Sequence, residues 1–265
     1  MKKQRIPNTE ECDCEALNER CEEAEKRLAA SQKESASKSY FLAQATHDLE
    51  QPLHALRIFI SLLKDTELKK DQQELVEKIG MAADNMYKLL ENYLDLSKIE
   101  YGGVRYESSE FCIDEVSGRL AEEFSLICVC QQKEFHYIPS KLVVETDKIL
   151  LERLLRNILS NAVKYAQKRV IFGCRRRGNF VQIEVLDDGK GISKKDIPHI
   201  FEEFYQSSED KENKKKGSGL GLAIVKKIAD IMSLDIKIRT KSKHGTSFNF
   251  QIPLATKKQE DLFRG

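Results

Sequence analysis

Apolar residues recur every three or four positions over two long stretches of this 265-residue chain, which is the period of one helix face. The first stretch starts as a weak heptad seam in a region rich in Glu, Ala, Lys and Arg (10–39) and becomes strongly apolar at Leu56, Phe59 and Leu63. After a polar loop expected at 64–71, the second stripe comprises Leu75, Ile79, Met86, Leu89, Leu90, Tyr93 and Leu96. Two antiparallel helices cannot cover both stripes, so the spacing favours a four-helix bundle made by two chains.

Beyond Gly102-Gly103, which we take as a domain boundary, the pattern changes to short strands and helices. We expect helices at 114–127, 148–165, 194–200 and 220–232. We expect strands at 135–138, 142–145, 169–175, 180–186, 236–240 and 247–252. The predicted fold class is therefore α+β, with a helical hairpin followed by an α/β sandwich of one sheet and one helical layer. The expected domains are an N-terminal helix or coiled-coil linker (1–38), the hairpin (39–102), the sandwich (103–254) and a polar tail (255–265).

Composition excludes several classes of protein. Lys and Arg number 44 and Asp and Glu 43, so no excess charge points to nucleic acid or a membrane surface. The apolar runs are too short to span a bilayer, and we expect no membrane segment. Seven cysteines without a small disulfide-rich frame favour a reducing compartment and a cytoplasmic location, and we interpret the cluster Cys12, Cys14 and Cys21 as helix-surface residues.

One histidine has an unusual neighbourhood. His47 falls outside the apolar seam of its helix and precedes a carboxylate, Asp48. An exposed imidazole beside a carboxylate can act as a nucleophile, although a plain surface histidine fits the same position. Pro52 cannot donate a hydrogen bond to the carbonyl of Asp48, so we expect it to bend or loosen the turn that carries His47.

The helix expected at 148–165 presents polar side chains at spacings of four and three residues. Asn157, Asn161 and Lys164 share one face, and Tyr165 follows. Amide oxygens can coordinate Mg²⁺ and an ammonium can contact phosphate, whereas an ordinary solvated face would carry similar residues.

Two glycine-rich turns follow. Asp187 ends an expected strand before Gly189 and Gly191, where a carboxylate could accept a hydrogen bond from an exocyclic amine and the glycines would admit a flat ligand. Asp-Asp-Gly would suit a polar hairpin turn equally well. Gly217, Gly219 and Gly221 precede an apolar helix whose N-terminus could hold polyphosphate.

Together these motifs resemble those of the sensor histidine kinases of two-component signalling, over about 39–254. The phosphoacceptor box corresponds to 41–53, around Thr46-His47-Asp48-Leu49-Glu50-Gln51-Pro52-Leu53. The N box corresponds to 154–165, the G1 box to 187–192, the F box to 200–205 and the G2 box to 217–225, with a closing Gly-Thr-Ser-Phe at 245–248.

The resemblance implies a dimerisation and histidine-phosphotransfer hairpin followed by a Bergerat-type (GHKL) ATP-binding domain. It implies that His47 is the phosphoacceptor, that Asp48 orients it or acts as base, and that Asn161, helped by Asn157, binds Mg²⁺. Lys164 would contact phosphate, Tyr165 would lie beside the nucleotide and Asp187 would bind adenine. The rest of the implied ATP site comprises Gly189, Gly191, Gly217, Gly219, Leu220, Gly221 and Leu222.

The same resemblance implies the cofactors ATP and Mg²⁺. It also implies a homodimer, an aspartate of a response-regulator receiver domain as the next phosphoryl acceptor, and input from a separate sensor or upstream protein.

Two positions depart from the family pattern. Gln51 stands where Thr or Asn is common, and a glutamine there can still position water for phosphatase activity. Gln206 stands where Arg often follows the F box, so Lys214, Lys215 and Lys216 are candidates to supply the charge.

Two other functions fit parts of the pattern. An ATPase of the gyrase and heat-shock-chaperone type would need a glutamate one turn before the metal-binding asparagine, where this chain has Asn157, and would leave the His47 helix without a purpose. A catalytically idle dimer scaffold would not need His47, Asn161, Asp187 and the glycines together.

Overall fold

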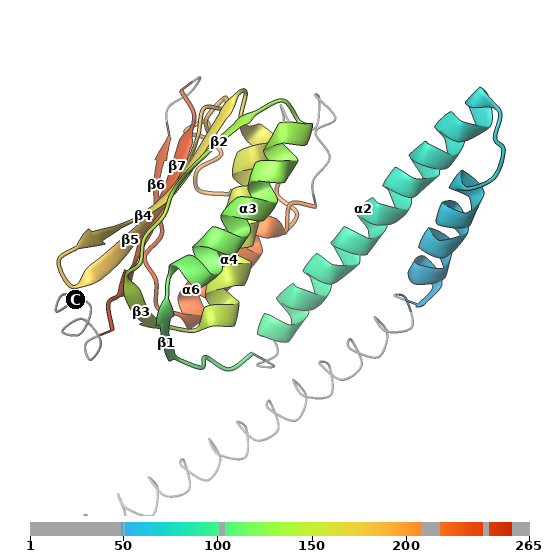
Figure 1. Ribbon diagram of the computed structural model, residues 1–265. Coiled ribbons are helices and arrows are strands. Elements are labelled where there is room, and N and C mark those ends of the chain that lie inside the picture. The colour runs from blue at the N-terminus through green and yellow to red at the C-terminus, as the bar shows by residue number, and fades with distance from the viewer. Residues whose placement is uncertain (1–48, 50, 101–103, 208–217, 241–243, 256–265) are drawn as a thin grey trace, which may run out of the picture. The chain divides into compact units, whose positions relative to one another are not determined.

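The computed structural model describes residues 49, 51–100, 104–207, 218–240 and 244–255 (Figure 1). The chain separates into two compact units, residues 1–83 with 100–103 and residues 84–99 with 104–265. The predicted N-terminal helix (1–38), the turn carrying His47 and Asp48, the boundary at Gly102-Gly103 and the lysines at 214–216 lie outside the described residues.

The first unit contains a helical hairpin. Residues 51–64 are helical, a short loop follows, and helix α2 (Lys70–Glu100) begins in this unit, while its residues 84–99 are counted with the second unit. At the start of α2, the Lys69 backbone N–H donates to Gln72 Oε1 at 3.0 Å, which is the bond that a capping box forms between the side chain at N3 and the N-cap backbone. Asp71 adds a favourable negative charge in the first turn. The loop is therefore shorter than the expected 64–71, because α2 begins at its cap.

This hairpin buries little apolar surface of its own. Ile60, Val76 and Ala83 form its small core, with Leu68 packed against them. Much larger apolar side chains stay exposed in the single chain, and Phe59 retains 63% of its surface. The other large apolar residues of the unit that are exposed are Leu49, Leu56, Ile58, Leu62, Leu63, Leu75, Ile79 and Met81. The predicted need for a partner helix pair is consistent with this surface, and the two-chain bundle stays a prediction.

The second unit is built on a five-stranded sheet in the order β2-β4-β5-β7-β6. Its strands are β2 (Glu134–Ile138), β4 (Arg169–Arg177), β5 (Phe180–Asp187), β6 (Lys237–Thr240) and β7 (Thr246–Pro253). Only the β2–β4 pair is parallel; the other three pairs are antiparallel. A separate antiparallel pair joins β1 (Ser109–Cys112) to β3 (Val143–Thr146).

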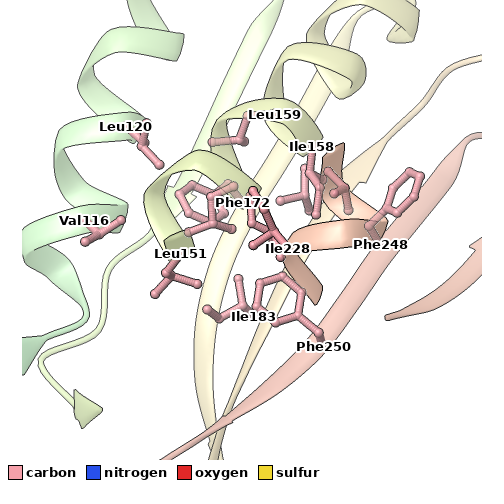
Figure 2. Close-up of a cluster of buried hydrophobic side chains, with 14 of the residues drawn as sticks. Val116, Leu120, Leu151, Ile158, Leu159, Phe172, Ile183, Ile228, Phe248 and Phe250 are labelled. Carbon is pink, nitrogen blue, oxygen red and sulfur yellow. The ribbon is translucent and has the colours of Figure 1, made fainter. Parts of the chain in front are cut away.

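Three helices cover one face of the sheet: α3 (Asp114–Cys130), α4 (Lys148–Tyr165) and α6 (Gly221–Ile231) (Figure 1). The strands alternate, so that Val170 and Phe172 on β4 and Ile183 and Val185 on β5 point into the core. Figure 2 shows side chains of the three helices meeting those of β4, β5 and β7, including Leu151, Ile158, Phe172, Ile228 and Phe250. The predicted α+β class with one sheet and one helical layer is confirmed.

Helix α4 begins at the predicted residue because Asp147 caps it. Asp147 Oδ1 accepts from the backbone N–H groups of Ile149 and Leu150, both at 2.9 Å, and Oδ2 accepts from that of Glu107 at 2.9 Å. The cap satisfies donors that would otherwise be orphaned and sets the rotational phase of the helix. None of the described helices is long and apolar enough to cross a membrane.

Two expectations about local structure were wrong. The helix expected at 194–200 is a series of turns instead, because Pro198 has no N–H to donate in the middle of so short a segment. Strand β1 was not expected, since only Phe111 of its four residues is buried and its pairing partner β3 is distant in sequence. Among the described residues of the second unit, the remaining predicted strands and helices are confirmed; α4 has the predicted ends, and the ends of the others differ by at most three residues.

Candidate functional site

A cavity opens between α4, the end of β5, the turns after β5, the start of α6 and β7. The residues that line it are Asn161, Ala162, Tyr165, Asp187, Lys190, Gly191, Ile192, Ser193, Asp196, Ile200, Tyr205, Gln206, Ser207, Leu222, Thr246 and Phe248. Asn161, Tyr165, Asp187, Gly191 and Leu222 were predicted site residues, and folding brings them to this one cavity. Most of the residues that line it have polar or charged side chains, and Ile192, Ile200, Leu222 and Phe248 supply an apolar part.

The polar face of α4 has two parts. Asn161 and Tyr165 line the cavity, whereas Asn157 and Lys164 are not among the lining residues. Asn157 Nδ2 donates to the Arg153 carbonyl at 2.9 Å, and its Oδ1 points toward the start of α6, where a Cβ on Gly221 would lie 3.2 Å from it. Lys164 Nζ lies over the Tyr165 ring, 4.7 Å from its centroid.

Asp187 is the last residue of β5 and is only 5% exposed. Burial raises the pKa of its carboxyl from 3.8 to about 6, while backbone hydrogen bonds from Gly189 and Thr246 act in the opposite direction. The Gly189 N–H donates to Asp187 Oδ1 at 2.8 Å. A desolvated carboxylate at the wall of a cavity is a strong hydrogen-bond acceptor.

The neighbouring Asp188 has a different role. Its Oδ1 accepts from the backbone N–H groups of Gln167 at 2.9 Å and of Lys168 and Arg169 at 3.0 Å, which tie the turn after β5 to the segment between α4 and β4. These bonds lower the pKa of Asp188 although burial acts to raise it. Of the two adjacent carboxylates, only Asp187 lines the cavity.

Close backbone approach explains two of the glycines beside Asp187. A Cβ on Gly189 would lie 2.4 Å from the Tyr165 carbonyl oxygen, so any side chain there would push the turn away from α4. Gly245 has φ +90°, and a Cβ on it would lie 1.8 Å from the Asp187 carbonyl oxygen. Because neither glycine has a side chain, the turn after β5 can lie against the end of α4 at Gly189, and the residue before β7, Gly245, can lie against Asp187.

The second glycine turn is described from Ser218 onward, so Gly217 lies outside the described residues. Gly219 has φ +73°, Leu220 is buried at the N-cap of α6, and Gly221 begins the helix. Leu222 faces the cavity. Among the predicted catalytic residues, Gln51 is an exposed helical residue of the first unit, and His47 and Asp48 are outside the described residues.

Sequence reasoning missed eleven lining residues. They are Ala162, Lys190, Ile192, Ser193, Asp196, Ile200, Tyr205, Gln206, Ser207, Thr246 and Phe248. Lys190 carried a signal that could have been used, because it stands between Gly189 and Gly191; its Nζ lies 6.0 Å from the centroid of the Tyr165 ring. The described residues contain no cluster of three His, Cys, Asp or Glu side chains able to hold a metal.

Comparisons with known proteins match both parts of the chain. The family model "Histidine kinase-, DNA gyrase B-, and HSP90-like ATPase" matches residues 146–256, which contain the cavity. The family model "His Kinase A (phospho-acceptor) domain" matches residues 37–102, which contain His47.

Full-length relatives extend well beyond this chain. The sensor histidine kinase RcsC of Escherichia coli is 31% identical over 237 residues, which are 88% of this chain and 25% of RcsC. The autoinducer 2 sensor kinase/phosphatase LuxQ of Vibrio cholerae is 30% identical over 255 residues, 90% of this chain and 29% of LuxQ. The chain thus spans between a quarter and a third of these two relatives.

A solved structure shares the fold. The structure of full-length ShkA in complex with AMPPNP covers 83% of this chain and 46% of ShkA, with a TM-score of 0.69 and 24% sequence identity. With a phosphoacceptor domain and an ATPase domain matched in that order, and relatives aligned across both, the chain belongs to the family of two-component sensor histidine kinases.

Proposed function

We propose that this chain is an ATP-dependent protein histidine kinase that transfers the γ-phosphoryl group of ATP to His47 and then to an aspartate of a response-regulator receiver domain. The observation that carries the proposal is the cavity, where Asn161 and Tyr165 of α4 meet the buried Asp187 in a chain that also matches the phosphoacceptor model over His47. Phosphoryl transfer needs mainly positioning and charge neutralisation, which such a cavity can supply.

At the purine end of the site, Asp187 would accept a hydrogen bond from the exocyclic amine of adenine. The buried carboxylate has few competing donors, so this bond discriminates strongly for a base that carries an amino group. Gly189 and Gly191 let the backbone approach the ring without a Cβ between them.

The amides of α4 fit a magnesium ion. Mg²⁺ prefers oxygen ligands and keeps several waters, so one or two protein oxygens together with phosphate oxygens suffice. Asn157 uses its nitrogen on the Arg153 carbonyl, and its oxygen is directed away toward the start of α6. Asn161, which lines the cavity, would therefore be the main protein ligand of the ion, and Asn157 would contribute more weakly. The ion would neutralise developing charge on the transferred phosphoryl group.

Two observations support a homodimer as the working unit. The apolar residues left exposed on the hairpin, such as Phe59, Leu62 and Leu75, need a partner surface. The phosphoacceptor model also covers the whole hairpin. Input would come from a sensor region or an upstream signalling protein.

Labelling with γ-³²P-ATP tests the kinase function. We expect the full chain to incorporate an acid-labile, alkali-stable label, and His47→Ala to incorporate none, because no other imidazole would take its place. His54→Ala, three residues into the described helix, is the matched control and should retain label. Release of phosphate without label would indicate a simple ATPase, and neither label nor release would indicate a scaffold.

We also propose phosphatase activity toward the phosphorylated regulator, with Gln51 positioning the attacking water. Gln51 is an exposed helical residue that stands four positions after His47 in the sequence, and the relative LuxQ is named a sensor kinase/phosphatase. Gln51→Ala should slow dephosphorylation of the regulator by about tenfold or more, in line with loss of a water-positioning group, while autophosphorylation persists. Unchanged dephosphorylation in this variant would contradict the assignment.

A further inference from the structure

One wall of the cavity has no regular secondary structure. The wall segment, residues 193–207, consists of single turns held by backbone bonds such as Asp196 N–H to the Ser193 carbonyl and Ile200 N–H to the Asp196 carbonyl, both at 3.0 Å. Six of its residues nevertheless line the cavity: Ser193, Asp196, Ile200, Tyr205, Gln206 and Ser207. Because no continuous series of helical backbone hydrogen bonds holds the wall segment, its position depends on side-chain contacts.

Asp196 connects the two ends of the wall segment. Its Oδ1 accepts from the Tyr205 hydroxyl at 2.7 Å, and its Oδ2 accepts from the Ser193 hydroxyl at 2.8 Å. The hydrogen bond to Asp196 raises the pKa of Tyr205, so the phenol remains a donor. The His199 ring stacks on that of Tyr205, with centroids 5.6 Å apart.

The Tyr205 end of the wall also contacts the start of α6. Phe204 has φ +59°, and a Cβ placed on Gly219 would lie 2.6 Å from the Phe204 carbonyl carbon and 2.9 Å from the Tyr205 carbonyl oxygen. The two backbones therefore touch, and the position of Tyr205 sets that of the glycine turn before Leu222, which lines the cavity. Holding Tyr205 in place thus fixes two sides of the cavity.

We propose that Asp196 is a positioning residue for ATP binding, acting through Tyr205 and Ser193 to hold the wall segment at the width that the nucleotide requires. The inference rests on the proposed function, because it assumes that this cavity holds ATP. Both carboxylate oxygens of Asp196 already accept a hydrogen bond from a hydroxyl group of the wall segment. Its carboxylate therefore shapes the site, in contrast to Asp187, which presents its own acceptor to the ligand.

Tyr205→Phe is the cleanest test, because it removes only the hydroxyl. In the full chain, we expect a five- to tenfold rise in the KM for ATP, about the net effect of one typical hydrogen bond, with kcat at saturating ATP unchanged. Asp196→Asn should raise KM by at least as much. Adding Tyr205→Phe to Asp196→Asn should raise it little further, because the two residues act through one bond.

A second tyrosine provides a matched control. Tyr137 also donates to an aspartate, Asp114 Oδ1 at 2.5 Å, and its hydroxyl also contacts a serine, Ser117, but none of these three lines the cavity. Tyr137→Phe should lower the thermal midpoint and leave the KM for ATP unchanged. An equal rise in KM for Tyr137→Phe and Tyr205→Phe would overturn the inference, because the effect would then be one of general stability.

Three further outcomes would overturn it. The first is a Tyr205→Phe variant with the KM of the wild type. The second is strict additivity of the two substitutions, and the third is an Asp196→Asn effect that disappears at high Mg²⁺, which would make Asp196 a metal ligand. Failure of the wild-type chain to bind ATP at all would instead defeat the proposed function.

Discussion

The Asp187→Asn variant is expected to lose measurable ATP binding and to be more stable than the wild type in the absence of nucleotide at pH 8. Binding is lost because the amide presents a donor where the amine of adenine needs an acceptor, and a buried mismatch of this kind typically weakens binding by a factor of about 10⁴ or more. The wild type should itself bind ATP more weakly as the pH falls below about 6, where Asp187 becomes protonated.

The gain in stability follows from the raised pKa of Asp187. A carboxyl that is harder to ionise in the folded state stabilises the fold at low pH, and this contribution is lost as the pH rises through about 6. The difference from the ordinary value of 3.8 corresponds to an ionisation penalty of about 3 kcal/mol at pH 8. Asparagine removes the charge but adds an NH₂ group that needs a partner, so we expect a net gain of about 1–2 kcal/mol.

Urea unfolding at pH 8 and pH 4, with ATP binding by calorimetry, checks both effects. The gain should vanish at pH 4, where Asp187 is protonated in the wild type. Asp188→Asn is the opposing control: its pKa is lowered by three backbone donors, so this variant should be less stable than the wild type at pH 8. Tight ATP binding by Asp187→Asn would refute the assignment of Asp187 as the adenine acceptor.

Gly245→Ala should be among the most destabilising single substitutions in the ATP-binding unit. The new Cβ would lie 1.8 Å from the Asp187 carbonyl oxygen, and a φ of +90° is unfavourable for any residue with a Cβ. Backbone strain and overpacking each cost about 1–3 kcal/mol, so together we expect a loss of about 2–6 kcal/mol. Relief of the clash must move the start of β7 away from Asp187, so ATP affinity should fall as well.

Gly178→Ala separates the two causes. Gly178 also has a positive φ, +60°, but a Cβ there would meet nothing within 4 Å. This variant should therefore show the conformational cost alone, about 1 kcal/mol, and should bind ATP normally. Equal losses of stability for the two variants would show that the contact between Gly245 and Asp187 has no energetic weight.

Local pattern was sufficient for much of this site. Spacings of four and three residues placed Asn157, Asn161 and Lys164 on one face of a predicted helix, which forms at the expected residues 148–165. Asp187 at the end of an alternating strand, followed by glycines, was recognisable because strand period and turn chemistry act over a few residues. The apolar stripes of the hairpin are likewise a local property, and their exposure in the single chain agrees with the predicted need for a partner.

The sequence by itself thus determined most of the described elements and the chemistry that their residues can offer: a histidine beside a carboxylate, an asparagine face and two adjacent aspartates before a glycine turn. Only the tertiary structure decided that Asp187 is the buried aspartate while Asp188 ties the turn after β5 to the segment between α4 and β4, and that Asp196 and Tyr205 support the cavity wall. The physical reason is that burial and long-range hydrogen bonds depend on which segments meet in space. Periodicity and propensity, being local, carry no such information.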